Sequence, residues 1–340
     1  MDVLSDVLAV MRTGRVRSAL VTWHAPWAQE FAAVPGSAGF HVVLRGSCVL
    51  LRADAAPLPL AAGDIVFRPH GDSHTLADAP TTHSATPPCA PSDLVNLPRY
   101  AVVGSPTNPP TAPPDQVHPA VAGSAAPSPG QPRRAVAGSA GSALAGVAVT
   151  LCGAYELDPD LVHPLMRDLP DLIHVPAELG RHPHLRATMD LLAGELAHPG
   201  PGTEALIPAL LDTLLVYLLR TWLSGDHPTG WAAALADPVT AAALQAIHRE
   251  PAHDWTVASL AAEAGLSRAP FARRFAEVLG QPPMTYLTWW RMTVAAGLLR
   301  RTDTPLSGIA AQVGYASEFA FAAAFKRRFG LAPGRYRRTR

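Results

Sequence analysis

The order of hydrophobic and polar residues divides the chain into β-type and helical parts. Residues 2–12 carry apolar side chains at helical spacing, which predicts a short amphipathic helix. Short apolar runs of β type follow, separated by glycine and proline. These runs are residues 19–23, 40–44, 48–52, 65–68 and 147–154. Several short strands with such punctuation predict a small barrel or sandwich of β-strands.

The segment from residue 79 to residue 146 lacks any such period. Fourteen of the 35 prolines lie between residues 80 and 132, among alanine, serine, threonine and glycine. A stretch of this composition buries too little apolar surface to offset the entropy of ordering it. We therefore expect residues 79–146 to form a Pro/Ala-rich disordered insertion.

After the last β-type run the pattern is helical. Residues 184–197 are amphipathic, and residues 203–223 are apolar on most sides, so other structure or the second subunit of a homodimer must cover that helix. Pro238 suits the first turn of a further helix. The chain is thus expected to be an α+β multidomain protein. Its parts are a β-rich domain at 1–178, a helical linker or dimerisation region at 182–230 and an all-α domain at 236–340.

One segment of the C-terminal quarter occurs twice, over residues 256–286 and 305–336. Each copy has a glycine that can take positive φ at a helix end, followed by a serine that can cap the next helix. These turn residues are Gly265 and Ser267 in the first copy, and Gly314 and Ser317 in the second. The repeat predicts two helix-turn-helix units.

The second helix of each unit presents residues that suit duplex DNA. In the first copy Arg273 can reach a guanine edge, while Arg268 and Arg274 suit phosphates. The second copy favours apolar contacts, a hydrogen bond from a cytosine amino group to Glu318, and phosphate anchoring. A helix expected over residues 284–301 is about 27 Å long. Because the major groove repeats every ~34 Å along one DNA face, this helix can set both units into successive grooves.

With these motifs, residues 238–337 resemble the DNA-binding domain of the AraC/XylS family of bacterial transcription regulators. The resemblance includes Gly-Tyr-Ala-Ser-Glu-Phe at 314–319 and Phe-Lys-Arg-Arg-Phe-Gly at 325–330. It implies double-stranded promoter DNA and RNA polymerase as partners. It also implies base contacts by Ala269, Ala272 and Arg273, and by Glu318, Phe319, Ala322 and Ala323. The expected DNA-binding set further contains Arg268, Arg274, Ser317, Lys326 and Arg327.

A second resemblance covers the β-rich domain. Gly63, Pro69, Gly71 and His74 have the spacing of the second cupin motif, and residues 40–46 resemble the strand and turn of the first. This domain is similar to the cupin-type sensor domain of one branch of AraC-type regulators. The resemblance implies an N-terminal cupin-like β-barrel that receives an effector.

His41, His74 and Cys152 are the candidate residues of that effector pocket. Their donor atoms suit zinc, with His24 or Cys48 as a further ligand. The paired histidines and the glutamate of the first cupin motif are absent, because two valines follow His41. The alternative is that these residues line the pocket without metal. Cys152 is also a candidate redox trigger, since a thiolate beside a cationic side chain is reactive, although buried cysteine more often packs as a small hydrophobe.

A net charge of zero hides an asymmetry that fits this organisation. Residues 250–340 carry 13 Lys or Arg against 6 Asp or Glu, and residues 1–249 carry 14 against 21. A basic C-terminal region on an acidic body suits a polyanion partner.

Three cysteines without CxxC spacing require no oxidising compartment. No signal peptide or membrane span is expected, and the protein is placed in the cytoplasm. Scattered histidines such as His163 are expected at the surface.

Two functions follow from these features. The favoured one is a dimeric DNA-binding transcription factor, in which a small molecule or a redox signal sensed by the N-terminal domain shifts the orientation of the DNA-binding domain. The alternative is a cupin metalloenzyme, such as an oxygenase, that carries a DNA-binding tail. The sequence leaves open the effector, the target genes and the choice between activation and repression.

Overall fold

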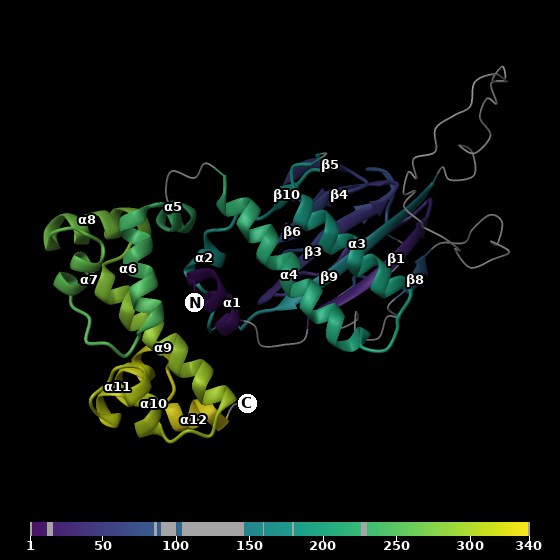
Figure 1. Ribbon diagram of the computed structural model, residues 1–340. Coiled ribbons are helices and arrows are strands. Elements are labelled where there is room, and N and C mark those ends of the chain that lie inside the picture. Colours follow the sequence, from purple (N-terminus) through teal and green to yellow (C-terminus); the bar gives the residue numbers. More distant parts are fainter. Residues whose placement is uncertain are drawn as a thin grey trace, which may run out of the picture.

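The computed structural model describes residues 2–11, 16–84, 87–89, 100–103, 146–158, 160–178, 180–225 and 230–338. A β-rich part lies beside a helical part that contains the C-terminus (Figure 1). The predicted α+β organisation is therefore confirmed. The predicted N-terminal helix is also present as α1 (Val3–Met11), and it packs against helices of the C-terminal part.

The strands of the described residues form two sheets. Their bounds are β1 Arg17–His24, β2 Ala28–Phe31, β3 Ser37–Arg45, β4 Ser47–Arg52, β5 Ala55–Ala61, β6 Ile65–Arg68, β7 His74–Ala77, β8 Tyr100–Val103, β9 Val147–Glu156 and β10 Ile173–Val175. One sheet has the order β10-β6-β3-β9-β1-β8, and the other has the order β2-β7-β4-β5. All five predicted β-type runs are strands. Sequence reasoning missed β2, β5, β7 and β10, because three of them have four residues or fewer and β5 carries two prolines.

Alternation along the strands separates two hydrophobic cores. On β1, Ala19, Val21 and Trp23 point into the space between the sheets, whereas Leu20 points to the opposite face. The core between the sheets also receives Val43, Cys48, Leu50, Leu60, Val66, Leu76, Ala148 and Cys152. The interior of the predicted barrel therefore corresponds to the space between these two sheets.

A piece of the predicted insertion is ordered. Strand β8 lies within residues 79–146 and pairs in parallel with β1, and Cys89 forms a bridge with Phe31. The prediction of a disordered insertion is wrong at these points, because β1 offers backbone groups on its outer side that a further strand can pair. The rest of this segment falls mostly outside the described residues.

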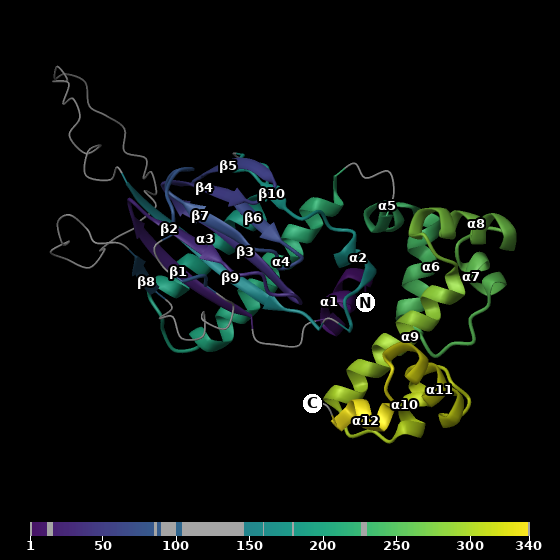
Figure 2. The same ribbon diagram turned by 180° about the vertical axis from the view of Figure 1, so that it is seen from behind.

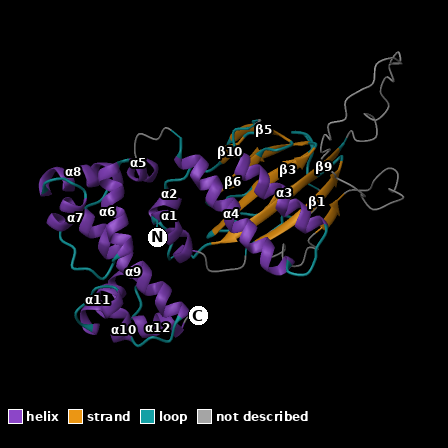
Figure 3. Ribbon diagram, in the orientation of Figure 1, coloured by secondary structure: helices purple, strands orange, loops and turns teal. Residues whose placement is uncertain are grey.

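Helices cover the outer face of the larger sheet. The chain continues through α2 (Pro164–Arg167), α3 (Pro183–Ala197) and α4 (Thr203–Leu223), which confirms both predicted helices. Helices α3 and α4 pack on each other and lie across the sheet (Figure 3). The Tyr155 hydroxyl of β9 donates a 2.6 Å hydrogen bond to the Leu211 carbonyl of α4. By length and composition α4 is the one helix of the described chain that could cross a membrane, and one of its faces packs against α3 and the larger sheet.

The C-terminal part contains two helical lobes joined by one long helix. The bounds are α5 Gly230–Ala236, α6 Pro238–Arg249, α7 Val257–Glu263, α8 Arg268–Leu279, α9 Pro283–Arg301, α10 Leu306–Gln312, α11 Glu318–Phe329 and α12 Pro333–Arg338. Helices α6, α7 and α8 pack together in the first lobe, and α10, α11 and α12 contact α9 in the second. Both predicted helix-turn-helix units are present, and α9 is the predicted joining helix.

The turn chemistry holds at three of the four predicted residues. Gly265 has φ of 68° and Gly314 has φ of 77°, the left-handed region that favours glycine. Ser317 caps α11 by accepting a 3.1 Å hydrogen bond from the Ala320 amide. Ser267 stands at the start of α8 but makes no capping bond, so its predicted cap is wrong. The physical reason is Pro270, which occupies the third helical position and has no N–H to donate.

The two turn glycines give a matched test of how tightly the lobes fit. We expect Gly265→Ala to lower the free energy of unfolding by about 1–2 kcal/mol. The added methyl group would contact no other atom, so the cost comes only from holding alanine in the left-handed backbone region. Gly314→Ala should cost about 1–3 kcal/mol more, because its Cβ would lie 2.6 Å from Arg291 Nη2 and 2.8 Å from the Ala252 carbonyl. Chemical denaturation of the two variants checks this, and equal losses would contradict it.

Candidate DNA interface and sensor pocket

Helix α8 buries one face and exposes the opposite one. Phe271 and Phe275 are fully buried in the first lobe, and the predicted DNA-binding residues therefore point outward. These are Arg268, Ala269 and Arg273, which are exposed, and Ala272, which is half-buried. Arg273 makes a long ion pair of 3.8 Å to Glu277 and keeps 74% of its side chain exposed. Its guanidinium is therefore available to a base edge.

Arg274 has an intramolecular role that the sequence did not suggest. Its guanidinium forms an ion pair with Asp237, and its Nε donates to the same carboxylate at 3.1 Å. Asp237 also caps α6 by accepting from the Thr240 amide. Partial burial opposes ionisation of Asp237, but the hydrogen bonds from Arg274 and Thr240 hold its pKa below the ordinary value. Arg274 thus ties α8 to the start of α6, and the phosphate contacts of Arg268 and Arg274 stay predictions.

Helix α11 repeats this division in the second lobe. Phe321 and Phe325 are fully buried, and the predicted DNA-binding residues lie on the other side. Ser317, Glu318, Phe319, Ala323, Lys326 and Arg327 are exposed, and Ala322 is half-buried. Phe319 is 85% exposed, an unusual position for a large apolar ring. This surface combines apolar groups with cations at the helix end, as predicted.

Helix α9 holds the two lobes at a defined spacing. Its 19 residues span about 28 Å. Arg291 in its middle donates to the carbonyls of Pro251 and His253 in the first lobe, and its guanidinium packs beside Gly314 in the second. Helices α8 and α11 both lie on the side away from the sheets in both views (Figures 1 and 2). One face of the molecule therefore presents both helices.

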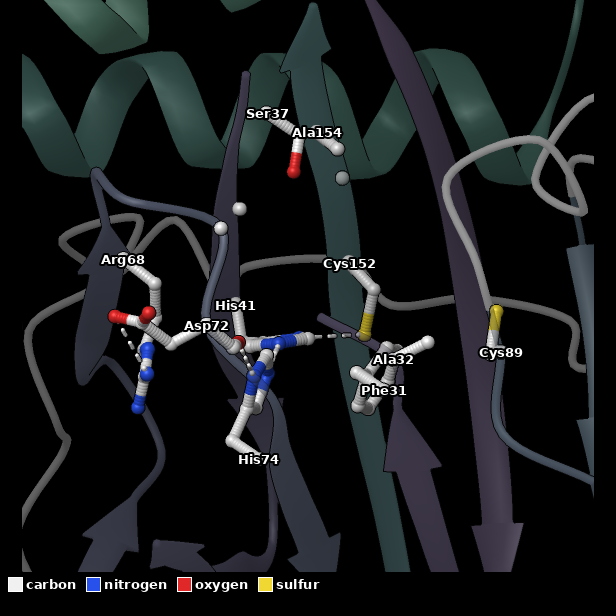
Figure 4. A pocket seen from close by; sticks show the side chains of 13 residues that line it. Phe31, Ala32, Ser37, His41, Arg68, Asp72, His74, Cys89, Cys152 and Ala154 are labelled. Carbon is white, nitrogen blue, oxygen red and sulfur yellow. Dashed lines mark hydrogen bonds and ion pairs between the residues drawn. The ribbon is translucent and has the colours of Figure 1, made fainter. Parts of the chain in front are cut away.

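The predicted pocket residues come together between the sheets. His41 on β3 and Cys152 on β9 are register partners on the inner face, and His74 reaches them from β7 of the smaller sheet. A cavity of about 40 Å³ adjoins them, and Figure 4 shows Arg68 and Asp72 on one side of it. The other lining residues are Phe31, Ala32, Ser37, Gly39, Gly71, Cys89, Gly153 and Ala154.

Hydrogen bonds connect the three predicted pocket residues in a chain, in which Cys152 donates to His41 and His41 donates to His74. His74 donates from Nδ1 to the Asp72 carbonyl at 3.2 Å, so its Nε2 accepts from His41 Nε2 at 2.6 Å. His41 Nδ1 then accepts from the Cys152 thiol at 3.1 Å. Burial lowers the pKa of His74 to about 4, lowers the pKa of His41 well below its ordinary value, and raises the pKa of Cys152 to about 12. All three groups are therefore neutral at pH 7.

Known protein families match both the β-rich part and the helical part of the chain. A family model described as a cupin matches residues 2–224, and one described as a helix-turn-helix domain matches residues 260–339. An AraC-like transcription regulator of Streptomyces antibioticus is 34% identical over 99% of each chain. The chain belongs to this family of AraC-like transcription regulators.

Two further comparisons cover segments of the regulator. RclR of Escherichia coli, described as an RCS-specific transcriptional activator, is 38% identical over 45% of this chain and 54% of its own. The solved DNA-binding domain of AdpA, in complex with a target DNA, is 31% identical over 30% of this chain and 92% of its own, with a TM-score of 0.29.

The pocket of this AraC-like regulator does not fit the predicted zinc ion. Metal ligands must surround one point with zinc–ligand distances of about 2.0–2.3 Å. Here Cys152 and His74 contact opposite nitrogens of the His41 ring, so His41 stands between them. Within the described residues no group of three or more His, Cys, Asp or Glu side chains is placed to hold a metal ion. Zinc binding stays a prediction that would require the three side chains to rearrange.

A buried polar cluster joins the cupin part of the regulator to its DNA-binding part. His163, at the start of α2, accepts from the Leu165 amide at Nδ1, so its Nε2 donates to the Tyr286 hydroxyl of α9 at 3.2 Å. Tyr286 donates to His248 Nε2 of α6 at 2.6 Å. His248 Nδ1 lies 3.4 Å from the Asp6 carboxylate of α1. The expectation of a surface position for His163 is wrong, because this side chain is fully buried.

A second connection runs along β9. Asp158, just beyond that strand, is buried and forms an ion pair with Arg300 near the end of α9. Arg300 also lies over the Tyr336 ring of α12, with its guanidinium carbon 4.8 Å from the ring centre. Sequence reasoning identified neither connection, because each joins residues more than 100 positions apart. The two contacts fix both ends of α9 against the cupin part.

The neighbouring arginines of α8 separate a DNA role from a structural role. We expect Arg273→Ala to weaken binding to the regulator's preferred DNA site by about 5- to 100-fold, with little change in melting temperature because its side chain is exposed. Arg274→Ala should lower the melting temperature, because it leaves the largely buried Asp237 without its ion pair. Fluorescence anisotropy and thermal denaturation measure the two effects. Equal DNA affinity of wild type and Arg273→Ala would contradict the assignment.

Burial of His163 predicts that acid destabilises the regulator. Burial, with the nearby charges of His248 and Arg167, lowers the pKa of His163 well below 6.5. The unfolded chain therefore binds a proton that the folded chain does not, so this contribution to stability is complete above pH 6.5 and falls as the pH drops below it. The loss is at most about 1.4 kcal/mol per pH unit.

The variant His163→Asn provides the control for this pH effect. Its side-chain oxygen can still accept from the Leu165 amide, but it cannot titrate. We expect a shallower decline of unfolding free energy between pH 6.5 and 5 in the variant, measured by urea denaturation. Parallel pH profiles of variant and wild type would show that His163 does not carry the effect.

Proposed function

We propose that this AraC-like regulator binds promoter DNA with α8 and α11 in successive major-groove segments, and that its cupin part controls this binding. The observation that carries the proposal is that both exposed helices lie on the side of the molecule away from the sheets, with Arg291 of α9 in contact with both lobes. A joining helix about 28 Å long can set its two flanking lobes into successive major-groove segments on one face of B-form DNA.

The two helices make different demands on the DNA sequence. Helix α8 carries Arg268 and Arg273, which can form hydrogen bonds with phosphates and guanine. Helix α11 carries Phe319 and two alanines, which suit thymine methyl groups, and its cations Lys326 and Arg327 suit phosphates. We therefore infer stricter base selection under α8 than under α11.

The effector acts through the pocket between the sheets. Neutral, mutually hydrogen-bonded His41, His74 and Cys152 favour a bound small molecule over a reactive thiolate. A redox signal, received by Cys152, is the second candidate input. The buried cluster at Tyr286 and the Asp158–Arg300 ion pair connect the domain that bears the pocket to α9, and a population shift can act through both contacts.

Further partners of the regulator belong to the same proposal. A second copy of the chain is the proposed dimer partner, with the exposed side of α4, including Leu206, as the contact surface. RNA polymerase is the partner through which bound regulator affects transcription, and the cytoplasm is the proposed location. We assign no catalytic step to the cupin part, because the donor groups of its pocket do not converge on a metal position.

Selection of DNA fragments by the full-length protein tests this function. We expect enrichment of a site with two half-sites about 10–11 base pairs apart, protected as one block in footprinting. Roughly 6–8 phosphate contacts should make log Kd rise steeply with log salt, with a slope of about 5–7. The control is Arg268→Ala combined with Arg273→Ala, which should lose selectivity under one half-site. Binding without preference over bulk competitor at moderate salt would overturn the proposal.

A further inference from the structure

We propose that the pocket is a receptor site for a small carboxylate, held by the guanidinium of Arg68. This inference deepens the proposed function, since it names the chemical class of the effector, and it rests on that function only for its effect on DNA binding. The proposal rests on an arginine that is buried between the sheets with most of its hydrogen-bonding capacity unused.

Arg68 is placed in the interior by the alternation of β6. Val66, two residues earlier, packs in the core between the sheets, whereas Ile65 and Phe67 belong to the opposite core. Arg68 therefore points inward, and 4% of its surface remains exposed. Burying a guanidinium is costly unless its donors find acceptors.

The donors of Arg68 are largely unpartnered. Nη2 lies 3.4 Å from a carboxylate oxygen of Asp72, which is longer than a good charge-assisted hydrogen bond. Nε and Nη1 are buried and have no hydrogen-bond partner within the described residues. A buried arginine in this state requires further acceptors, and a carboxylate supplies two in the planar arrangement that a guanidinium prefers.

The space beside Arg68 limits the size of the ligand. Arg68 pairs in register with Gly39 of β3, which pairs with Ala154 of β9, so two very small residues flank the guanidinium on the inner face. They leave the cavity of about 40 Å³, which holds roughly three water-sized groups. A ligand of three or four non-hydrogen atoms, such as formate or acetate, fits this space.

Charged side chains near Arg68 determine which group competes with a ligand for its guanidinium. Asp72 stands at the mouth with a side chain 53% exposed, so it can turn into solvent when another carboxylate binds. Asp171 and Arg52 lie within electrostatic range and oppose each other in sign. Asp72 is therefore the side chain that competes with the ligand. Its backbone carbonyl, which accepts from His74, is independent of that side chain.

The ligand site is connected to the DNA-binding part through β9. Ala154 lines the pocket, and four residues later Asp158 forms the ion pair with Arg300 of α9. Filling the cavity beside Ala154 acts on the strand whose end contacts α9. This geometry provides the differential contact that a population shift requires.

Binding of acetate to the full-length protein tests the site. We expect titration calorimetry to give a Kd of about 0.1–10 mM for sodium acetate, the range open to a ligand of four non-hydrogen atoms. The reference is sodium chloride at equal ionic strength. Sodium benzoate, which is too large for the cavity, should not bind. No acetate binding beyond the chloride reference would overturn the proposal.

Three variants identify the residues. Arg68→Met, which keeps the volume of the side chain, should weaken acetate binding at least tenfold. Gly39→Val should abolish binding, since a Cβ at Gly39 meets no atom closer than 3.8 Å and the two further methyl groups of valine would occupy the cavity beside Arg68. Asp72→Asn should tighten binding at least threefold, because it removes the competing charge. The exposed Arg45→Met serves as the matched control and should bind acetate like wild type.

These variants keep the two proposals separable. If Arg68→Met does not fold, Gly39→Val and Asp72→Asn still decide, and wild-type affinity in both would overturn the carboxylate site. Acetate should also change the affinity of wild-type protein for its selected DNA site, and should not do so for Gly39→Val. Acetate binding in a protein that selects no DNA would leave the site standing while the proposed function fails. Selective DNA binding without acetate binding would support the proposed function and overturn the carboxylate site.

Discussion

The arrangement of this regulator depends on the burial of Tyr286 at the junction between the cupin part and the DNA-binding part. A phenol removed from water must keep hydrogen-bond partners or destabilise the fold by about 1–3 kcal/mol. Tyr286 finds them on two sides, in His163 of the cupin part and His248 of the DNA-binding part. Both partners are held in turn, one by the Leu165 amide and the other by Asp6. Residues from α1, α2, α6 and α9 therefore form one cluster, and α9 cannot move away from the cupin part without disrupting it.

Helix α9 thus contacts the cupin part through one face and the two helical lobes through another. One face is buried against the cupin part through Tyr286 and Arg300. Another carries Arg291, which ties the first lobe to the turn of the second at Gly314. Because the same rigid helix serves both contacts, a displacement at the cupin side turns both recognition helices together. Under the proposed control by the cupin part, the whole DNA-binding surface would therefore change its presentation, and not one half alone.

The sequence predicted the features that depend on local signals. The helix-turn-helix repeat was recognisable because turn glycines and paired phenylalanines recur at fixed spacing, and their physical requirements are met within about 20 residues. His41, His74 and Cys152 were grouped from the cupin-motif spacing and their donor atoms, and the register of β3 and β9 places His41 beside Cys152. The predicted cap at Ser267 relied on the same kind of local signal and was wrong. Pro270 occupies the helical position whose backbone N–H a capping serine would bind, and proline has no N–H.

Contacts between distant segments of the chain were beyond such reasoning. Arg274 sits on the predicted exposed side, but only the fold brings Asp237 next to it. Likewise His163 is one histidine among fourteen in the sequence, and nothing near it indicates a tyrosine 123 residues away. Arg68 is the instructive case, because only the fold shows that it shares the inner face of β6 with Val66. An inward arginine in an otherwise apolar strand is a local contradiction, and such contradictions are expected where a protein binds something.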